Sequence, residues 1–173
     1  MELVTLLDEA GSAIGAAPKD QVHTESTPLH LAFSCYVIDS DGRLLVTRRA
    51  LMKRTWPGVW TNSFCGHPRP GENMIEAVVR RGTEEIGARP RDVTIALPDF
   101  RYRAVDASGI VEHEICPVHV ARIDGDVVPD PSEVMEFAWV LPDRLASAIE
   151  DAPFAFSPWL REQLPLLLDE GKI

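Results

Sequence analysis

The segment that decides the fold is Thr61–Ala88, which reads TNSFCGHPRPGENMIEAVVRRGTEEIGA. Apolar residues recur at spacings of three and four along its second half, which predicts a helix over Asn73–Ile86. Asn73 and Glu76 fit a capping pair at the start of this helix, shortly after a Pro–Gly turn. The segment is therefore read as a loop followed by a capped helix that is rich in carboxylates.

The composition is that of an ordinary globular protein. Hydrophobic residues make up 45% and charged residues 25%, and a length of 173 residues predicts a single domain over residues 1–173. The net charge of −10 argues against nucleic acid as a partner, because a sequence-independent grip on phosphates depends on Lys and Arg. No segment resembles a signal peptide or a membrane span, so we expect a cytoplasmic monomer with no membrane partner.

Three cysteines, Cys35, Cys65 and Cys116, cannot all pair with one another. A chain of this size does not need disulfide bonds for stability, so we expect three thiols in a reducing compartment. Cys35 and Cys116 lie in apolar runs and are expected in the core, whereas Cys65 stands two residues before His67 in a polar loop. Cys65 is therefore the thiol that needs a chemical explanation.

Strands are predicted on both sides of the helix. The apolar or β-branched runs that indicate them are Leu31–Ile38, Arg43–Thr47, Val93–Leu97, Phe100–Ala104, Ile110–Ala121 and Val134–Val140. Two further helices are predicted over Pro142–Glu150 and Pro158–Leu168. This order contains no regular βαβ repeat, so it predicts the α+β class or a three-layer sandwich.

The spacing of charges in the opening segment resembles the Nudix box, G-x5-E-x7-R-E-U-x-E-E-x-G-U, where U is a bulky aliphatic residue. The matching positions are Gly66, Glu72, Arg80, Glu84, Glu85 and Gly87. In the Nudix family this loop and helix hold a divalent metal ion that meets the substrate diphosphate, and Mg²⁺ prefers such oxygen ligands. The alternative without function is a set of ordinary ion pairs four residues apart on an exposed helix.

Two positions depart from the box. Arg81 stands where Nudix hydrolases carry the glutamate of the Arg–Glu pair, and Gly82 stands where a bulky apolar residue is usual. The missing carboxylate is a principal metal ligand of the hydrolytic site. We therefore expect a diphosphate to be held in this protein rather than cut.

Histidines and glutamates from other segments form a second set of candidate metal ligands. They are His23, His30, His67, Glu112 and Glu114. Glu112 and Glu114 alternate along a predicted strand, so both point to one side while His113 points away. Three imidazoles and two carboxylates suit Mn²⁺, Zn²⁺ or a crowded Mg²⁺. The alternative is a set of structural histidines beside a solvated strand edge.

A basic run, Arg48–Arg54 (RRALMKR), places four cations within seven residues of an acidic protein. An anionic ligand needs such a local concentration of positive charge. The alternative interpretation is a solvated loop after a strand.

Several motifs together resemble the type I isopentenyl-diphosphate isomerase family, whose members have the Nudix fold. They are RRALMKRTWPGVW, TNSFCGHP, PDFRYRA, GIVEHEICPV and FAFSPW, and the resemblance runs from about His23 to Trp159. It implies an α/β/α sandwich with a mixed β-sheet. It also implies reversible conversion of isopentenyl diphosphate to dimethylallyl diphosphate, a step of isoprenoid biosynthesis.

Moving this double bond requires one proton to be delivered and another removed, with a tertiary carbocation between the two steps. The resemblance places Cys65 on one face of the substrate and Glu114, with Tyr102 beside it, on the other. In the forward direction Glu114 and Tyr102 donate and Cys65 accepts, and we expect nearby cations or metal to lower the pKa of the thiol. Trp159 is implied to stabilise the cation with its indole face, although a tryptophan in an apolar segment also fits simple packing.

The resemblance also assigns the binding residues. The five metal ligands are His23, His30, His67, Glu112 and Glu114, and Glu85 helps to hold Mg²⁺ with the diphosphate. The cations around the diphosphate are Lys19, Arg49, Lys53 and Arg81.

Two alternatives stay open. A Nudix hydrolase of a nucleotide or prenyl diphosphate would share the fold, but it would keep the missing glutamate and would not need Cys65. A non-catalytic module that binds metal or diphosphate would leave the opposed Cys65 and Glu114 unexplained.

Overall fold

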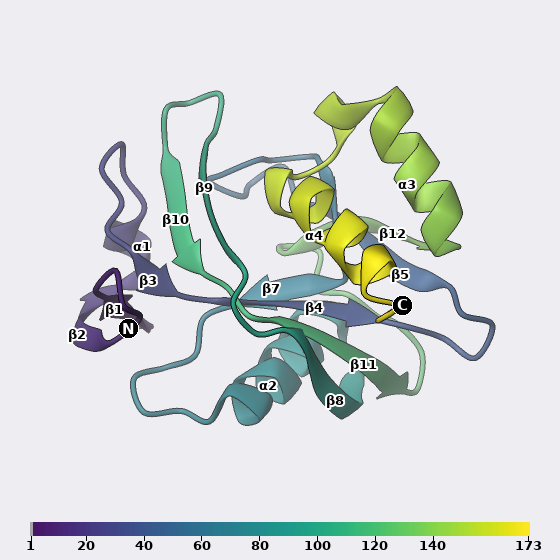
Figure 1. Ribbon diagram of the computed structural model, residues 1–173, viewed down its shortest axis with the longest axis horizontal. Coiled ribbons are helices and arrows are strands. Elements are labelled where there is room, and N and C mark those ends of the chain that lie inside the picture. Colours follow the sequence, from purple (N-terminus) through teal and green to yellow (C-terminus); the bar gives the residue numbers. More distant parts are fainter. Residues whose placement is uncertain (1) are drawn as a thin grey trace.

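The computed structural model describes residues 2–173 (Figure 1). Its centre is a four-stranded sheet in the order β7-β4-β11-β8. The bounds of these strands are Phe33–Val37 for β4, Phe64–Gly66 for β7, Arg89–Leu97 for β8 and Val118–Asp124 for β11. β4 and β11 run parallel, whereas β7 and β8 pair antiparallel with their neighbours, so the sheet is mixed.

Helices cover both faces of this sheet (Figure 1). Their bounds are Met74–Ile86 for α2, Pro142–Asp151 for α3 and Pro158–Asp169 for α4. Successive side chains of a strand point to opposite faces, so Phe33 on β4 packs in the same buried cluster as Val78 of α2. Tyr36 on the other face packs in the cluster that contains Leu160 of α4. This arrangement confirms the predicted α/β/α sandwich.

Two smaller sheets complete the fold. A three-stranded sheet has the order β12-β5-β6, with bounds Val134–Val140, Leu44–Arg49 and Trp60–Thr61. A five-stranded sheet has the order β2-β1-β3-β10-β9, with bounds Ala13–Pro18, Leu3–Leu7, His30–Leu31, Val111–Ile115 and Arg101–Val105. A short helix α1, Lys19–Val22, and a 3₁₀ turn η1, Pro153–Ala155, lie outside the sheets.

The prediction of one strand over Ile110–Ala121 is wrong. The chain forms β10 and β11 in two different sheets, with Cys116 and Pro117 between them. Pro117 has no N–H to donate, but its carbonyl accepts a hydrogen bond from the Ser34 N–H at 3.1 Å. The strand Val134–Val140 has the predicted bounds, and the other predicted strands and helices are present with shifted ends, except that Leu31–Ile38 divides at Ala32 into β3 and β4. The β1–β2 hairpin was not predicted.

Helix α2 begins and ends as its sequence indicates. The Asn73 side chain accepts hydrogen bonds from the N–H groups of Ile75 and Glu76 at 2.9 and 3.4 Å. Gly82 explains one departure from the Nudix box, because a Cβ there would lie only 2.3 Å from Cγ of Pro90. A bulky residue at this position would push α2 away from β8.

Candidate active site

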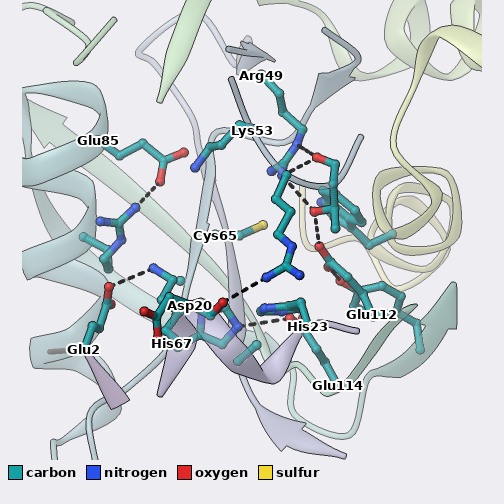
Figure 2. Close-up of a pocket in the computed structure, with 18 residues that line it drawn as sticks. Glu2, Asp20, His23, Arg49, Lys53, Cys65, His67, Glu85, Glu112 and Glu114 are labelled. Carbon is teal, nitrogen blue, oxygen red and sulfur yellow. Dashed lines mark hydrogen bonds and ion pairs between the residues drawn. The ribbon is translucent and has the colours of Figure 1, made fainter. Parts of the chain in front are cut away.

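A cavity of about 550 Å³ opens beside β10, α1, β7, α2 and the loop after β5 (Figure 2). All the site residues predicted from the sequence line this cavity except His30, which is fully buried. In Figure 2, Cys65 lies between the side that carries Glu85 and Lys53 and the side that carries His67 and Glu114. Segments far apart in the sequence therefore meet at one site.

Three histidines and one glutamate form a compact cluster on one side of the cavity. They are His23, His30, His67 and Glu114, whose potential ligand atoms lie within 4.8 Å of one another. Parallel pairing of β3 with β10 places His30 directly opposite Glu114. Nδ1 of His67 is buried without a hydrogen-bond partner anywhere in residues 2–173, and Nε2 of His30 lies 3.4 Å from Oε1 of Glu114. Imidazole nitrogens gathered around a buried carboxylate fit a divalent metal ion.

The protonation states of three members of this cluster suit metal binding. Burial lowers the pKa of His67 to about 4 and also lowers the pKa of His23. Burial opposes ionisation of Glu114, yet His30 and His67 together hold the pKa of Glu114 well below its ordinary value. Burial also acts to lower the pKa of His30, but its interaction with the Glu114 carboxylate prevails and raises that pKa. A carboxylate and neutral imidazoles are the forms that bind metal, so His30 would release its proton on binding.

Glu112 stands apart from the cluster. Its Oε1 accepts a hydrogen bond from the Thr55 hydroxyl at 2.6 Å, and its Oε2 accepts one from the Tyr102 hydroxyl at 2.6 Å. Tyr102 lies opposite Glu114 in the β9–β10 register, but its hydroxyl binds Glu112. Each carboxylate oxygen of Glu112 accepts one hydrogen bond and keeps a second lone pair, so Glu112 can still bind a metal ion.

Cys65 lies on β7 with its sulfur at the cavity wall. Its Sγ donates to Oδ1 of Asn62 at 3.3 Å and lies 3.4 Å from the hydroxyl of Ser34. Burial raises the pKa of the Cys65 thiol to about 12, and the charges of Glu85 and Glu114 add to this rise. The prediction that neighbouring cations lower this pKa is therefore wrong, because burial prevails and the thiol keeps its proton. Lowering of this pKa by a bound metal ion stays a prediction.

Trp159 comes from α4 and is only 2% exposed. Its Nε1 donates to Oδ1 of Asn62 at 2.9 Å, which orients the ring. The Arg49 guanidinium carbon lies 5.3 Å from the centre of the indole, and Tyr102 packs on it at 5.8 Å. The indole is thus a fixed aromatic surface of the cavity.

The four cations predicted for a diphosphate all have partners. Lys19 binds Glu2 at 3.0 Å, and Lys53 forms an ion pair with Glu133. Arg81 binds Glu85 at 2.7 Å. An incoming anion would have to exchange with these carboxylates.

The fourth of these cations, Arg49, binds backbone carbonyl oxygens rather than a carboxylate. Its guanidinium donates to the carbonyl oxygens of Thr55 at 2.8 Å and of Trp56 at 3.1 Å. These bonds hold the loop after β5 against the cavity, with Trp56 in a left-handed conformation at φ 42°. Arg49 therefore shapes the wall as well as charging it.

Four polar residues of the lining were not predicted from the sequence. They are Glu2, Asp20, Arg54 and Thr55. Arg54 belongs to the basic run and donates to the Asp20 carbonyl at 2.9 Å, so the run itself was a signal. Glu2 precedes every motif and carries no sequence signal of its own.

Comparison with known proteins places the chain in a family. The NUDIX domain family matches residues 28–165. The chain is 64% identical over 166 residues to the isopentenyl-diphosphate Delta-isomerase of Agromyces mediolanus, covering 96% of this chain and 81% of that protein. It is 60% identical over 169 residues to the enzyme of that name from Clavibacter sepedonicus, covering 98% and 89% of the two chains.

Solved structures agree on the fold. A Deinococcus radiodurans protein superposes with a TM-score of 0.74 at 19% identity, over 95% of this chain and 98% of that one. The MutT protein of Methanosarcina mazei superposes with a TM-score of 0.65 at 21% identity, over 84% and 97%. With a Nudix sandwich, the Cys65–Glu114 cavity and these relatives in evidence, the chain belongs to the isopentenyl-diphosphate Delta-isomerase family of Nudix-domain proteins.

Proposed function

We propose that this protein is an isopentenyl-diphosphate Delta-isomerase, which interconverts isopentenyl diphosphate and dimethylallyl diphosphate. The observation that carries the proposal is the presence of Cys65 and Glu114 in one cavity, beside a cluster of metal-binding side chains. The names of relatives about 60% identical over nearly the whole chain support the choice of substrate.

The proposed reaction moves one double bond and needs no net change in atoms. In the forward direction Glu114, assisted by Tyr102, donates a proton to the terminal alkene carbon, leaving a tertiary carbocation. The Cys65 sulfur then takes a proton from the carbon next to the diphosphate-bearing carbon, and the new double bond forms. The roles exchange in the reverse direction.

The pKa shifts of Cys65 and Glu114 correspond to one end of this cycle. Cys65 holds its proton and Glu114 is ionised, since burial raises the pKa of the thiol and the two histidines lower the pKa of Glu114. A forward turnover leaves the two groups in this state. The next forward turnover then requires a proton to return from the thiol side to Glu114 through solvent.

The proposed metal site consists of His23, His30, His67 and Glu114, with Glu112 as a fifth ligand through a lone pair that its hydrogen bonds leave free. The donor set fits Mn²⁺, Zn²⁺ or Mg²⁺. We propose a second ion, Mg²⁺, beside Glu85, where the carboxylate and the diphosphate would both bind it. Burial raises the pKa of Glu85, and a bound cation would favour its ionised form. When bound, these ions supply positive charge that fixes Glu114 and offsets the charge of the diphosphate.

We propose that Lys19, Arg49, Lys53 and Arg81 hold the diphosphate. They line the same cavity as Cys65 and Glu85. The Arg81 side chain is only 9% exposed, and ion pairs with Glu84 and Glu85 fix its position. Nudix hydrolases carry a glutamate at this position of the sequence. A cation at this position favours binding of the diphosphate over its hydrolysis.

The test is incubation of the purified protein with isopentenyl diphosphate, Mg²⁺ and Mn²⁺ in D₂O, followed by proton NMR. Deuterated dimethylallyl diphosphate is the expected product. Released phosphate would identify a hydrolase instead, and unchanged substrate would favour a binding module.

The proposal extends to the protein's setting. We propose one domain over residues 1–173, because the β1–β2 hairpin pairs with β3 and brings Glu2 and Lys19 to the cavity. We also propose a monomer in the cytoplasm, where the three free thiols stay reduced. A native mass measurement tests the monomer.

No helix within residues 2–173 is long and apolar enough to cross a bilayer.

A further inference from the structure

Asn62 links two groups of the proposed reaction through one oxygen atom. Its Oδ1 accepts from Trp159 Nε1 at 2.9 Å and from Cys65 Sγ at 3.3 Å. The neighbouring Thr61 hydroxyl donates to the same atom at 2.9 Å. Asn62 is fully buried, whereas Cys65 and Trp159 line the cavity.

The orientation of the Asn62 amide is determined by its partners. Its Nδ2 donates to the carbonyl oxygens of Cys35 at 3.0 Å and Phe64 at 2.8 Å. Carbonyl oxygens only accept, and an indole N–H only donates, so the amide oxygen must face Trp159. The Cys65 contact is on that same side, so the sulfur is held through its S–H.

The backbone of Asn62 is fixed as firmly as its side chain. Asn62 and Ser63 join β6 of the three-stranded sheet to β7 of the four-stranded sheet. The Thr47 hydroxyl on β5 donates to the carbonyls of Asn62 and Ser63 at 2.9 and 3.2 Å. Asn62 therefore lies at the junction of two sheets, and hydrogen bonds hold both its backbone and its side chain there.

A second hydrogen-bond chain holds the Cys65 sulfur from another direction. Gln163 Nε2 donates to the Ser34 hydroxyl at 3.0 Å, and that hydroxyl lies 3.4 Å from Cys65 Sγ. The Tyr36 hydroxyl donates to Oε1 of Gln163 at 2.9 Å, which fixes the Gln163 amide. Asn62 differs from this chain because it contacts the thiol and the indole together.

We propose that Asn62 is a positioning residue that sets the placement of the Cys65 thiol relative to the Trp159 indole. The inference rests on the proposed function, in which the thiol exchanges a proton with a carbon whose neighbour carries the positive charge. Both groups must then keep a fixed distance from one substrate. A single acceptor anchored between two sheets supplies that constraint.

The test compares Asn62→Ala with a matched control, Ser63→Ala. Ser63→Ala removes a buried hydroxyl that is bonded to the Val37 N–H and the Leu45 carbonyl, and it leaves the hydrogen bonds of Asn62 in place. In Asn62→Ala we expect kcat to fall by about 10- to 100-fold, the scale of a misplaced reacting group. KM should stay within about twofold, because the proposed diphosphate cations do not contact Asn62. Ser63→Ala should keep the wild-type kcat.

Two further measurements keep the test decisive. The Trp159 indole N–H signal in NMR, assigned from Trp159→Phe, should move upfield in Asn62→Ala and stay in place in Ser63→Ala. If Asn62→Ala does not fold, Asn62→Ser replaces it, since a hydroxyl serves one backbone carbonyl but is too short to reach both groups. Wild-type kcat in a folded Asn62 variant, or an equal loss of kcat in Ser63→Ala, would overturn the proposal.

The outcome is separable from failure of the proposed function. If the wild-type protein formed no dimethylallyl diphosphate, the proposed function would fail by itself. The same variants would then be compared by the rate at which iodoacetamide alkylates Cys65 in the ligand-free protein. A changed rate in Asn62→Ala alone supports its control of the sulfur, and equal rates in all three proteins contradict it.

Discussion

Trp159 is a buried indole whose ring forms part of the cavity wall. A carbocation formed away from water gains no hydration, and an indole has the side-chain quadrupole that best stabilises a positive charge. The effect reaches about 2 kcal/mol at a desolvated site, which corresponds to roughly 30-fold in rate. Because the Arg49 guanidinium already lies over the ring, we take this figure as the upper value.

We predict that Trp159→Phe lowers kcat modestly, because it keeps an aromatic face but loses the larger indole ring and its N–H donor. Trp159→Leu should lower kcat further, by up to about 30-fold, with little change in KM, since the ground-state alkene is neutral. Steady-state kinetics on variants of matched thermal stability check this. Equal kcat values for the two variants would mean that Trp159 only fills space.

The identity of the site residues was more predictable than their partners. Motif spacing indicated Cys65, Glu114 and Trp159, and all three line one cavity. The sequence did not indicate that the Tyr102 hydroxyl donates to Glu112. Tyr102 lies opposite Glu114 in the β9–β10 register, as predicted, but the direction of its side chain depends on packing. It also gave the wrong direction for the pKa of Cys65, since burial depends on the packing of distant segments.

Helix α2 contacts β8 through a residue without a side chain. At Gly82 the position of a Cβ falls 2.3 Å from Cγ of Pro90 and 2.8 Å from Cζ of Phe64. In an exposed helix, replacing glycine by alanine stabilises by about 1 kcal/mol. Here the steric conflict with Pro90 opposes that gain. The sign of the change in unfolding free energy therefore shows whether α2 and β8 are tightly packed.

We predict that Gly82→Ala lowers the free energy of unfolding by about 1–3 kcal/mol, the usual range for overpacking. Urea denaturation measures the change. Thr83→Ala at the next, exposed position is the control and should stay within about 0.5 kcal/mol of wild type. A stabilised Gly82→Ala protein would show that α2 and β8 separate more easily than their contacts suggest.

His119 on β11 makes this strand sensitive to acid. Burial lowers the pKa of its imidazole below the ordinary value of 6.5. The unfolded chain therefore binds a proton at a pH where the folded protein does not, so stability falls as the pH drops below about 6.5. Above about pH 6.5 the imidazole is mostly neutral in both the folded and the unfolded protein, so this loss of stability is absent there.

We predict that His119→Leu loses less unfolding free energy than wild type when the pH falls from about 7.5 to 5.5. Urea denaturation at both pH values, with a chelator present to remove metal effects, measures the difference. The other histidines are the same in both proteins, so they cancel. An equal loss in the two proteins would show that the imidazole of His119 is accessible to protons.

Elements governed by local sequence were predictable, and elements governed by pairing were not. The cap at Asn73 and the periodicity of α2 act within a few residues, so the helix was located correctly. Ile110–Ala121 reads as one apolar run because its sequence does not show that its two halves join different sheets. The β1–β2 hairpin has weak alternation, and its pairing with β3 stabilises it.

At the scale of the whole molecule, the proposed metal site consists of side chains from segments that are distant in the sequence. His23 follows α1, His30 lies on β3, His67 follows β7 and Glu114 lies on β10. An ion that binds only the folded protein stabilises the whole fold by mass action, by about 2.7 kcal/mol at 100 times its dissociation constant. Metal binding should therefore be visible in thermal unfolding.

We predict that EDTA removes activity, that Mn²⁺ or Mg²⁺ restores it, and that the returning ion raises the melting temperature of the wild-type protein. His67→Ala should bind the ion more weakly and show a smaller rise, because one ligand is missing. Thermal scans with metal analysis check both effects. Equal, tight occupancy in wild type and His67→Ala would remove His67 from the ligand set.

The central claim is that Cys65 and Glu114 exchange protons with one substrate in the shared cavity. Its most direct test is the rate at which Cys65→Ala and Glu114→Gln form deuterated dimethylallyl diphosphate from isopentenyl diphosphate in D₂O. Both variants should be slower than wild type by at least about 100-fold, the lower end of general acid–base effects, and Cys65→Ala should remain folded. Near wild-type turnover in either folded variant would contradict the mechanism.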